Sequence, residues 1–281
     1  MMNALEIRNL TKSYPGFTLD NLTLILPSGC IMGLIGENGA GKSTTIKLIL
    51  DMIHKDSGSI TILGKDNRDN IELTKEEIGV VMDEIGIPEC LTVQQVGNVM
   101  KHTFQNWDEA EYDRLVQEFS LPDNKQFKEF SRGMKMKLGI AIALSHHAKL
   151  LILDEATSGL DPVVRDEVVE MFSDFTRDES HSILISSHIV SDLEKLCDYI
   201  AFLHKGKLLL CEEKDQLLAK YGLIHCTAEE LKNLPTEAIK FKKENPYGVE
   251  AMVLRSVIPS NVNISPISIE EMFVFTVKEA R

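Results

Sequence analysis

An eight-residue pattern near the N-terminus, GENGAGKS at 36–43, constrains the fold more than any other feature of this sequence. It fits the spacing G-x-x-x-x-G-K-[ST], in which glycines let the backbone curl its N–H groups inward around phosphate groups. An apolar run at 30–35 precedes it and predicts a strand buried on both faces, and apolar residues at helical spacing follow over 42–53. Because strand, glycine turn and helix come in the required order, the sequence predicts a phosphate-binding loop rather than a chance turn.

The residues of this loop each have an expected part in holding a nucleotide. The Lys42 ammonium is expected to face the β and γ phosphates, and the Ser43 hydroxyl is expected to ligate Mg²⁺. The helix that opens at Lys42 adds the positive end of its dipole to the same anion. The predicted nucleotide ligands of the loop are Gly36, Glu37, Asn38, Gly39, Ala40, Gly41, Lys42, Ser43 and Thr44.

A pair of acidic residues follows a second apolar strand, in LLILDEATSGLD at 150–161. The carboxyl ends of such strands are where α/β sheets bind ligands. We expect Asp154 to hold Mg²⁺ through water and Glu155 to orient or deprotonate the water that attacks the terminal phosphate. An ordinary helix N-cap after a strand is the alternative, but the phosphate loop already requires a second partner for Mg²⁺.

Composition narrows the class of protein. The chain has 281 residues, 43% of them hydrophobic and 26% charged, which is typical of a soluble globular protein. A formal net charge of −13 argues against nucleic acid as the main partner, because phosphate backbones are bound by surplus Lys and Arg. Five scattered cysteines predict free thiols in a reducing cytoplasm. The longest apolar stretch, 22–35, is interrupted at 27–29, so we expect no membrane span and a cytoplasmic chain.

The apolar patterns along the chain predict an α/β fold with added parts. Strand and helix patterns alternate from 150 to 203, which indicates a mainly parallel sheet with helices on its faces. Further strands are expected at 5–10, 17–26 and 59–63, and helices are expected at 92–101, 108–119, 131–145, 162–175, 189–197 and 215–221. We interpret about 84–147 as a helical subdomain.

The last part of the chain, 222–281, has weaker signals and no recognisable chemistry. Its patterns favour a small α+β extension or a partner surface. The strands expected there are 239–241, 251–254 and 273–277, with a helix at 228–234.

The nucleotide motifs together resemble those of the ATP-binding subunit of an ABC transporter, and within that family the single-domain subunits that pair with separate membrane proteins of the ABC-2 type. The resemblance covers about 4–221 and implies a P-loop NTPase core of the ABC ATPase type, in a domain at 1–221, with an antiparallel β-subdomain. It implies ATP and Mg²⁺ as cofactors. It also implies two partners, a second ATP-binding subunit and a transmembrane permease, which would hold the chain at the cytoplasmic face of the membrane.

The segment FSRGMK at 130–135 stands where this family has its signature motif. Ser131 is a natural N-cap for the helix that follows. The resemblance implies that Ser131 and Gly133 reach the γ-phosphate held by the partner subunit, although an ordinary helix cap is the simpler alternative. Arg132 replaces a small residue of the family pattern, and it either reaches a phosphate or ribose or is solvated.

Three more residues match family positions. Asp161 ends SGLD at 158–161, where it can cap the helix opening at Pro162 and, by resemblance, touch the opposite subunit. His188 follows a predicted strand and matches the histidine that contacts the γ-phosphate and the attacking water. Tyr14 resembles the aromatic residue that stacks on adenine, with a turn-flanking core residue as the alternative.

The largest departure from the family pattern is Asp83, in IGVVMDEIG at 78–86, where a glutamine is usual. A carboxylate there can ligate Mg²⁺, but it also brings negative charge near a triphosphate and weakens binding unless the metal offsets it.

The sequence therefore predicts a subunit in which ATP drives dimer closure and powers a transporter, with export favoured. Soluble ABC-type ATPases of translation, DNA repair or protein assembly are the alternative. A single phosphate loop and the absence of sustained heptads disfavour them. A binding protein that has lost hydrolysis is disfavoured by the presence of both Glu155 and His188.

Overall fold

The structure is a computed structural model, and it describes residues 3–68, 75–83, 86–246 and 248–279. Its first layer is a four-stranded antiparallel sheet in the order β2-β1-β4-β5. The first two strands form a hairpin around Pro15 and Gly16, and Gly16 has a φ of 85° that suits this turn. The strands are β1 (Asn3–Tyr14), β2 (Phe17–Pro27), β4 (Ser57–Ile62) and β5 (Lys65–Asp66).

The central layer is a six-stranded sheet in the order β10-β9-β3-β8-β7-β6, parallel except for β10 at its edge. The expectation of a mainly parallel α/β sheet is confirmed. Its strands are β3 (Ile31–Ile35), β6 (Ile78–Val81), β7 (Leu150–Asp154), β8 (Ser182–Ser187), β9 (Tyr199–His204) and β10 (Lys207–Glu213).

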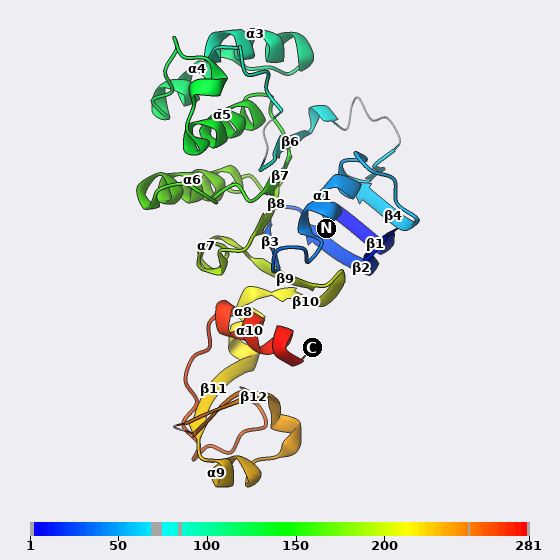
Figure 1. Cartoon of the computed structure of the whole chain (residues 1–281), viewed down its shortest axis with the longest axis vertical. Helices are drawn as coiled ribbons and strands as arrows, with labels where there is room; N and C mark the ends of the chain where they lie inside the picture. The colour runs from blue at the N-terminus through cyan, green and yellow to red at the C-terminus, as the bar shows by residue number, and fades with distance from the viewer. Residues whose placement is uncertain (1–2, 69–74, 84–85, 247, 280–281) are drawn as a thin grey trace.

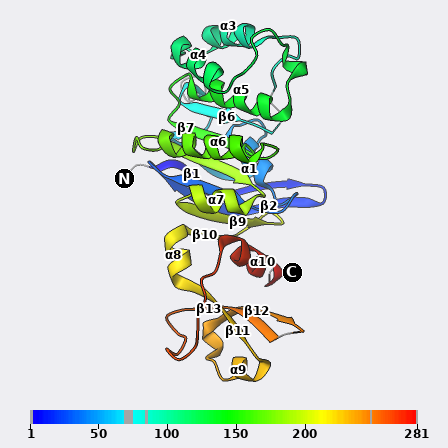
Figure 2. The ribbon, with the colours of Figure 1, turned by 90° about the vertical axis from the view of Figure 1, so that its left-hand side faces the viewer.

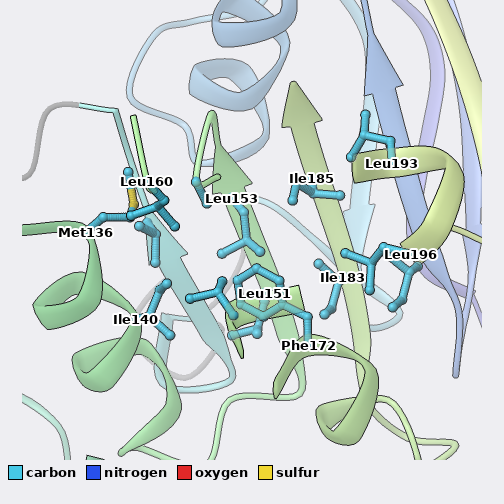
Figure 3. Close-up of a cluster of buried hydrophobic side chains, with 14 of the residues drawn as sticks. Met136, Ile140, Leu151, Leu153, Leu160, Phe172, Ile183, Ile185, Leu193 and Leu196 are labelled. Carbon is cyan, nitrogen blue, oxygen red and sulfur yellow. The ribbon is translucent and has the colours of Figure 1, made fainter. Parts of the chain in front are cut away.

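The inner strands are apolar throughout because both faces of the sheet are covered. On one face, Leu150 and Ile152 pack with the antiparallel sheet and with helix α1 (Lys42–Ile49). On the other face, Leu151 and Leu153 pack against helices, as Figure 3 shows. Those helices are α5 (Arg132–Leu144), α6 (Pro162–Phe175) and α7 (Val190–Leu196).

Three α-helices between β6 and β7 form the helical part of the molecule, at one end of the sheet (Figure 2). Thr92 caps the first with a capping box and Asp108 caps the second, so the predicted starts of both helices are correct. The short η1 (Phe127–Glu129) precedes α5. The three helices are α3 (Val93–Thr103), α4 (Glu109–Glu118) and α5.

The C-terminal part is a small α+β unit that returns to the core. Its antiparallel sheet has the order β11-β13-β12, and its last helix lies between this sheet and the central one (Figure 1). The Phe273 ring of that helix meets the Phe202 ring of β9 with centroids 5.3 Å apart. The elements are α8 (Lys214–Lys220), β11 (Tyr221–Cys226), α9 (Ala228–Lys232), η2 (Thr236–Ala238), β12 (Ile239–Asn245), β13 (Gly248–Leu254) and α10 (Ile269–Glu279).

The strand predicted at 273–277 is wrong, because these residues belong to α10. Apolar residues at 273, 275 and 277 imitate strand alternation, but Ser268 and Glu271 form reciprocal cap hydrogen bonds that start a helix. Other predicted helices also end earlier than expected. The helix that begins at Lys42 ends at Ile49 rather than at 53. The helix expected at 215–221 is α8 (Lys214–Lys220), and the unforeseen strand β11 begins at Tyr221.

Among the residues that the structure describes, no helix is both long and apolar enough to cross a membrane.

Candidate nucleotide site

The glycine-rich loop joins the end of β3 to the start of α1, as the sequence predicts. Gly39 has a φ of 80° and Gly41 a φ of 112°, values that side chains other than glycine rarely adopt. Gly36 is required for space, because a Cβ there would lie 2.6 Å from the Leu203 carbonyl oxygen. The loop is therefore bent and tightly packed against β9.

Lys42, the first residue of α1, has its side chain almost fully buried, with 6% exposed. Its Nζ donates to the Gly36 carbonyl at 2.7 Å and lies 3.4 Å from the Glu155 Oε1. The phosphate loop and the acidic end of β7 therefore meet. This contact is the one on which a nucleotide site at this sheet edge depends.

Glu155 follows β7 in a strained backbone conformation, with a φ of 54°. Its N–H donates to the Ser186 carbonyl at 3.0 Å, which fixes the residue to the neighbouring strand β8. This geometry directs the carboxylate toward Lys42 on one side, while the His188 Nδ1 lies 2.7 Å from the Glu155 Oε2 on the other. A carboxylate held between an ammonium and an imidazole is suited to orienting a water molecule.

Asp154, the last residue of β7, lies beneath this arrangement and is buried. Its Oδ1 accepts a hydrogen bond from the Ser186 Oγ at 2.5 Å. Ser186 was not singled out from the sequence, although the register pairs it with Asp154 across β7 and β8. One serine thus supports both acidic residues, since its carbonyl holds the backbone of Glu155.

A cavity of about 690 Å³ opens above the loop, within the size range of ligand sites. It is lined by Phe17, Glu37, Asn38, Gly39, Ala40, Gly41, Lys42, Ser43, Thr44, Asp83, Arg132, Glu155, Ser158 and His188. Residues predicted from four separate segments of the sequence therefore share one cavity.

Asp83 and Arg132 meet at the side of this cavity. The Arg132 Nη2 donates to the Asp83 Oδ1 at 2.5 Å and lies 3.5 Å from the Ser158 Oγ. Of the two alternatives for Arg132, the structure decides neither: the guanidinium is paired with Asp83 at the cavity, and its side chain is still 54% exposed.

The remaining predicted residues lie outside the cavity lining. Ser131 caps α5 by accepting the Met134 N–H at 3.2 Å, and Asp161 caps α6 by accepting the N–H groups of Val163 and Val164, each at 3.1 Å. Gly133 is in the first turn of α5. Both caps follow the sequence expectation.

The aromatic residue at the cavity is Phe17, which the sequence analysis did not consider as a ligand. Tyr14, the residue predicted to stack on adenine, is 41% exposed and faces Phe17 across the β1–β2 hairpin. The position of Phe17 directly after the Pro15–Gly16 turn was the available signal, because it places the ring at the same hairpin end.

A parallel sheet whose strand ends carry a glycine loop, a buried lysine and paired acidic residues defines a P-loop nucleotide-hydrolysing protein. The family described as ABC transporter matches residues 19–158. The lantibiotic transport ATP-binding protein SrtF of Streptococcus pyogenes is 40% identical over 215 residues, which are 75% of this chain and 91% of that protein. The ABC transporter ATP-binding protein YtrB of Bacillus subtilis (strain 168) is 28% identical over 283 residues, 96% of this chain and 97% of that protein.

Solved structures agree with these relatives. One described as the ATP-binding subunit of an ABC transporter superposes with a TM-score of 0.69 at 30% identity, and the match covers 76% of this chain and 91% of that one. The chain belongs to the family of ABC transporter ATP-binding proteins. It is an ATP-binding and ATP-hydrolysing subunit that powers a transporter.

Proposed function

We propose that the chain drives export through a separate membrane permease, by closing on ATP together with a second ATP-binding subunit. Export is favoured by the similarity to SrtF, whose name assigns it to lantibiotic transport. Both named relatives are transport proteins, which disfavours a soluble ATPase of translation, DNA repair or protein assembly. The observation that carries the proposal is the contact between Lys42 and Glu155 within one cavity, because it joins phosphate binding to a catalytic carboxylate.

The loop from Gly36 to Thr44 would hold the triphosphate with its backbone N–H groups, and Lys42 would exchange its contact with Glu155 for the β and γ phosphates. The donor set present fits Mg²⁺, which prefers hard oxygen ligands. Ser43 lines the cavity, Asp154 lies at the end of β7, and Asp83 is at the cavity side. When bound, the ion neutralises phosphate charge and polarises the terminal phosphate.

Glu155 and His188 would be the catalytic residues. Once the phosphates take Lys42, the Glu155 carboxylate retains the His188 contact at 2.7 Å and is available to orient the attacking water. The strained backbone of Glu155 supports this role, because strain of this kind is retained where it positions a functional group.

Ser131, Gly133 and Asp161 are proposed to act across the dimer. They lie outside the cavity of their own chain, and Ser131 and Asp161 are exposed. Tyr14 is proposed to stack on the adenine, at the hairpin end where Phe17 already lines the cavity.

We also propose a division into an ATPase domain at 1–221, with the helical subdomain at about 84–147, and an extension at 222–281. The helical subdomain and the segment around Asp83 would dock on the permease, which would hold the chain at the cytoplasmic face of the membrane.

Glu155→Gln tests the proposed function. The amide preserves the shape of the side chain but removes the base, so this variant should retain ATP, lose turnover by about 100-fold or more, and form an ATP-dependent dimer on size exclusion. The isosteric Glu179→Gln, in the loop before β8, is the control and should behave as wild type. Turnover of Glu155→Gln at the normal rate would remove Glu155 from the catalytic role.

A further inference from the structure

The two departures from the family pattern, Arg132 and Asp83, form a single contact. They are 49 residues apart in sequence: Asp83 follows β6, and Arg132 is the first residue of α5. The Arg132 Nη2 lies 2.5 Å from the Asp83 Oδ1. The same guanidinium approaches the loop after β7, where Ser158 Oγ is 3.5 Å from Nη2 and a Cβ on Gly159 would lie 3.0 Å from the Arg132 Cδ. Arg132 therefore joins three segments that border the cavity.

The other basic side chains that line the cavity are paired in the same manner. Lys42 is 3.4 Å from Glu155, and the His188 ring is 2.7 Å from the same carboxylate. Each basic side chain of the cavity thus lies against an acidic side chain of its own subunit. Mg·ATP would offer these groups competing partners. The phosphates would attract the basic side chains, and the metal would attract the carboxylates.

The exposure of the pair decides whether such an exchange is feasible. The side chains of Arg132 and Asp83 are 54% and 49% exposed. Exposed ion pairs change an equilibrium constant by no more than about fivefold, whereas a buried pair would resist separation. The contact is therefore weak enough for a metal ion to replace it.

We propose that Arg132 is a positioning residue, which holds Asp83 in the nucleotide-free chain and yields it to Mg²⁺ when Mg·ATP binds. This inference rests on the proposed function, because it uses Asp83 as a ligand of the nucleotide's metal. It also explains how the chain accommodates a carboxylate where the family has a neutral glutamine. The Arg132 guanidinium balances the negative charge of Asp83 until the metal takes the place of the guanidinium.

A double-mutant cycle of Asp83→Asn and Arg132→Gln tests the exchange in the full chain. The measurement is the Kd for a non-hydrolysable ATP analogue with Mg²⁺, by calorimetry. If binding separates the pair, the free energy gained when Asp83 contacts the metal is partly offset by the loss of its contact with Arg132. Asp83→Asn should therefore weaken binding about two- to fivefold more in the Arg132→Gln background than in the wild-type background. This range follows from the strength of exposed ion pairs.

Three controls make the result specific. In EDTA, with the same analogue, the two substitutions should act independently because no metal competes for Asp83. Arg132→Lys keeps the charge and should restore part of the coupling. The exposed pair of Arg177 and Asp174, 2.9 Å apart in α6 and the turn after it, gives a matched cycle that should show no coupling.

The outcomes separate this inference from the proposed function. A cycle in which the two effects are independent in Mg²⁺ would overturn the exchange while leaving ATP binding intact. If the wild-type chain fails to bind the Mg²⁺-loaded analogue at all, or if Lys42→Ala binds it equally well, the proposed nucleotide site itself is refuted.

Discussion

The two sides of the nucleotide cavity are built in different ways. On the phosphate-loop side, Lys42 is buried and Gly36 has no room for a methyl group, so the groups are fixed by packing against the central sheet. On the helical side, Asp83 and Arg132 are about half exposed, and their side chains contact each other, with Ser158 near the guanidinium. A rigid side, the proposed phosphate site, thus faces a side that we propose to be exchangeable. The two halves of the site therefore differ in how firmly their side chains are held.

The largest effect should come from Lys42→Ala, on the rigid side. The variant loses at least two charge-assisted contacts to phosphate, about 3 kcal/mol or more, which corresponds to at least about 100-fold in ATP affinity. Lys47→Ala, at an exposed position of the same helix, is the control and should bind ATP normally. Comparable affinities of the two variants by calorimetry would contradict the rigid-side assignment.

A smaller effect is expected from Gly36→Ala, which tests whether the loop is rigid. The new methyl group would lie 2.6 Å from the Leu203 carbonyl oxygen and 2.8 Å from the Ala40 Cβ, so backbone must shift. Overpacking of this kind costs about 1–3 kcal/mol in the free energy of unfolding, and ATP binding should weaken with it.

Gly86→Ala, three residues after Asp83 in the sequence, is the matched control, because a Cβ there meets nothing within 4 Å. Its free energy of unfolding, from urea denaturation, should change by less than about 0.5 kcal/mol. If Gly36→Ala is as stable as Gly86→Ala, the contrast in packing between the two sides does not hold.

The smallest effect concerns pH and His146, a buried residue that follows α5 and does not line the cavity. Burial lowers the pKa of His146, whose ring stacks on Phe104 with centroids 4.1 Å apart. The folded chain favours the neutral ring. The contribution of the ring to the free energy of unfolding is therefore intact above the ordinary pKa of 6.5, and it is lost progressively as the pH falls below that value. The free energy of unfolding should therefore drop between pH 7.5 and pH 5.5, and His146→Asn should drop less. An equal drop in both chains would remove His146 as the cause.

Sequence reasoning located the rigid side well because its determinants are local. The loop at 36–43, the strand before it and the acidic pair Asp154–Glu155 each carry their signal within a dozen residues. The caps at Ser131 and Asp161 were predicted for the same reason, since a cap depends on the next three residues alone.

The exchangeable side was not predictable, because it depends on residues that only the fold brings together. Asp83 and Arg132 were each noted as departures, but nothing in the sequence shows that the end of β6 meets the start of α5. The same reason hid β11, whose strand conformation comes from pairing with β13 about 30 residues later. The error at α10 was avoidable, since Ser268 and Glu271 form a capping box that is visible in the sequence.

The return of α10 to the core has a practical consequence for dissecting the chain. Met272 and Phe275 belong to the same apolar cluster as Leu151 and Ile183 of the central sheet. Truncation of the chain after residue 221 would therefore remove α10 from an apolar cluster that it shares with the central sheet. A shortened fragment would carry bare hydrophobic surface beside β9, the strand on which the glycine loop rests, and its solubility and nucleotide affinity would both report the loss.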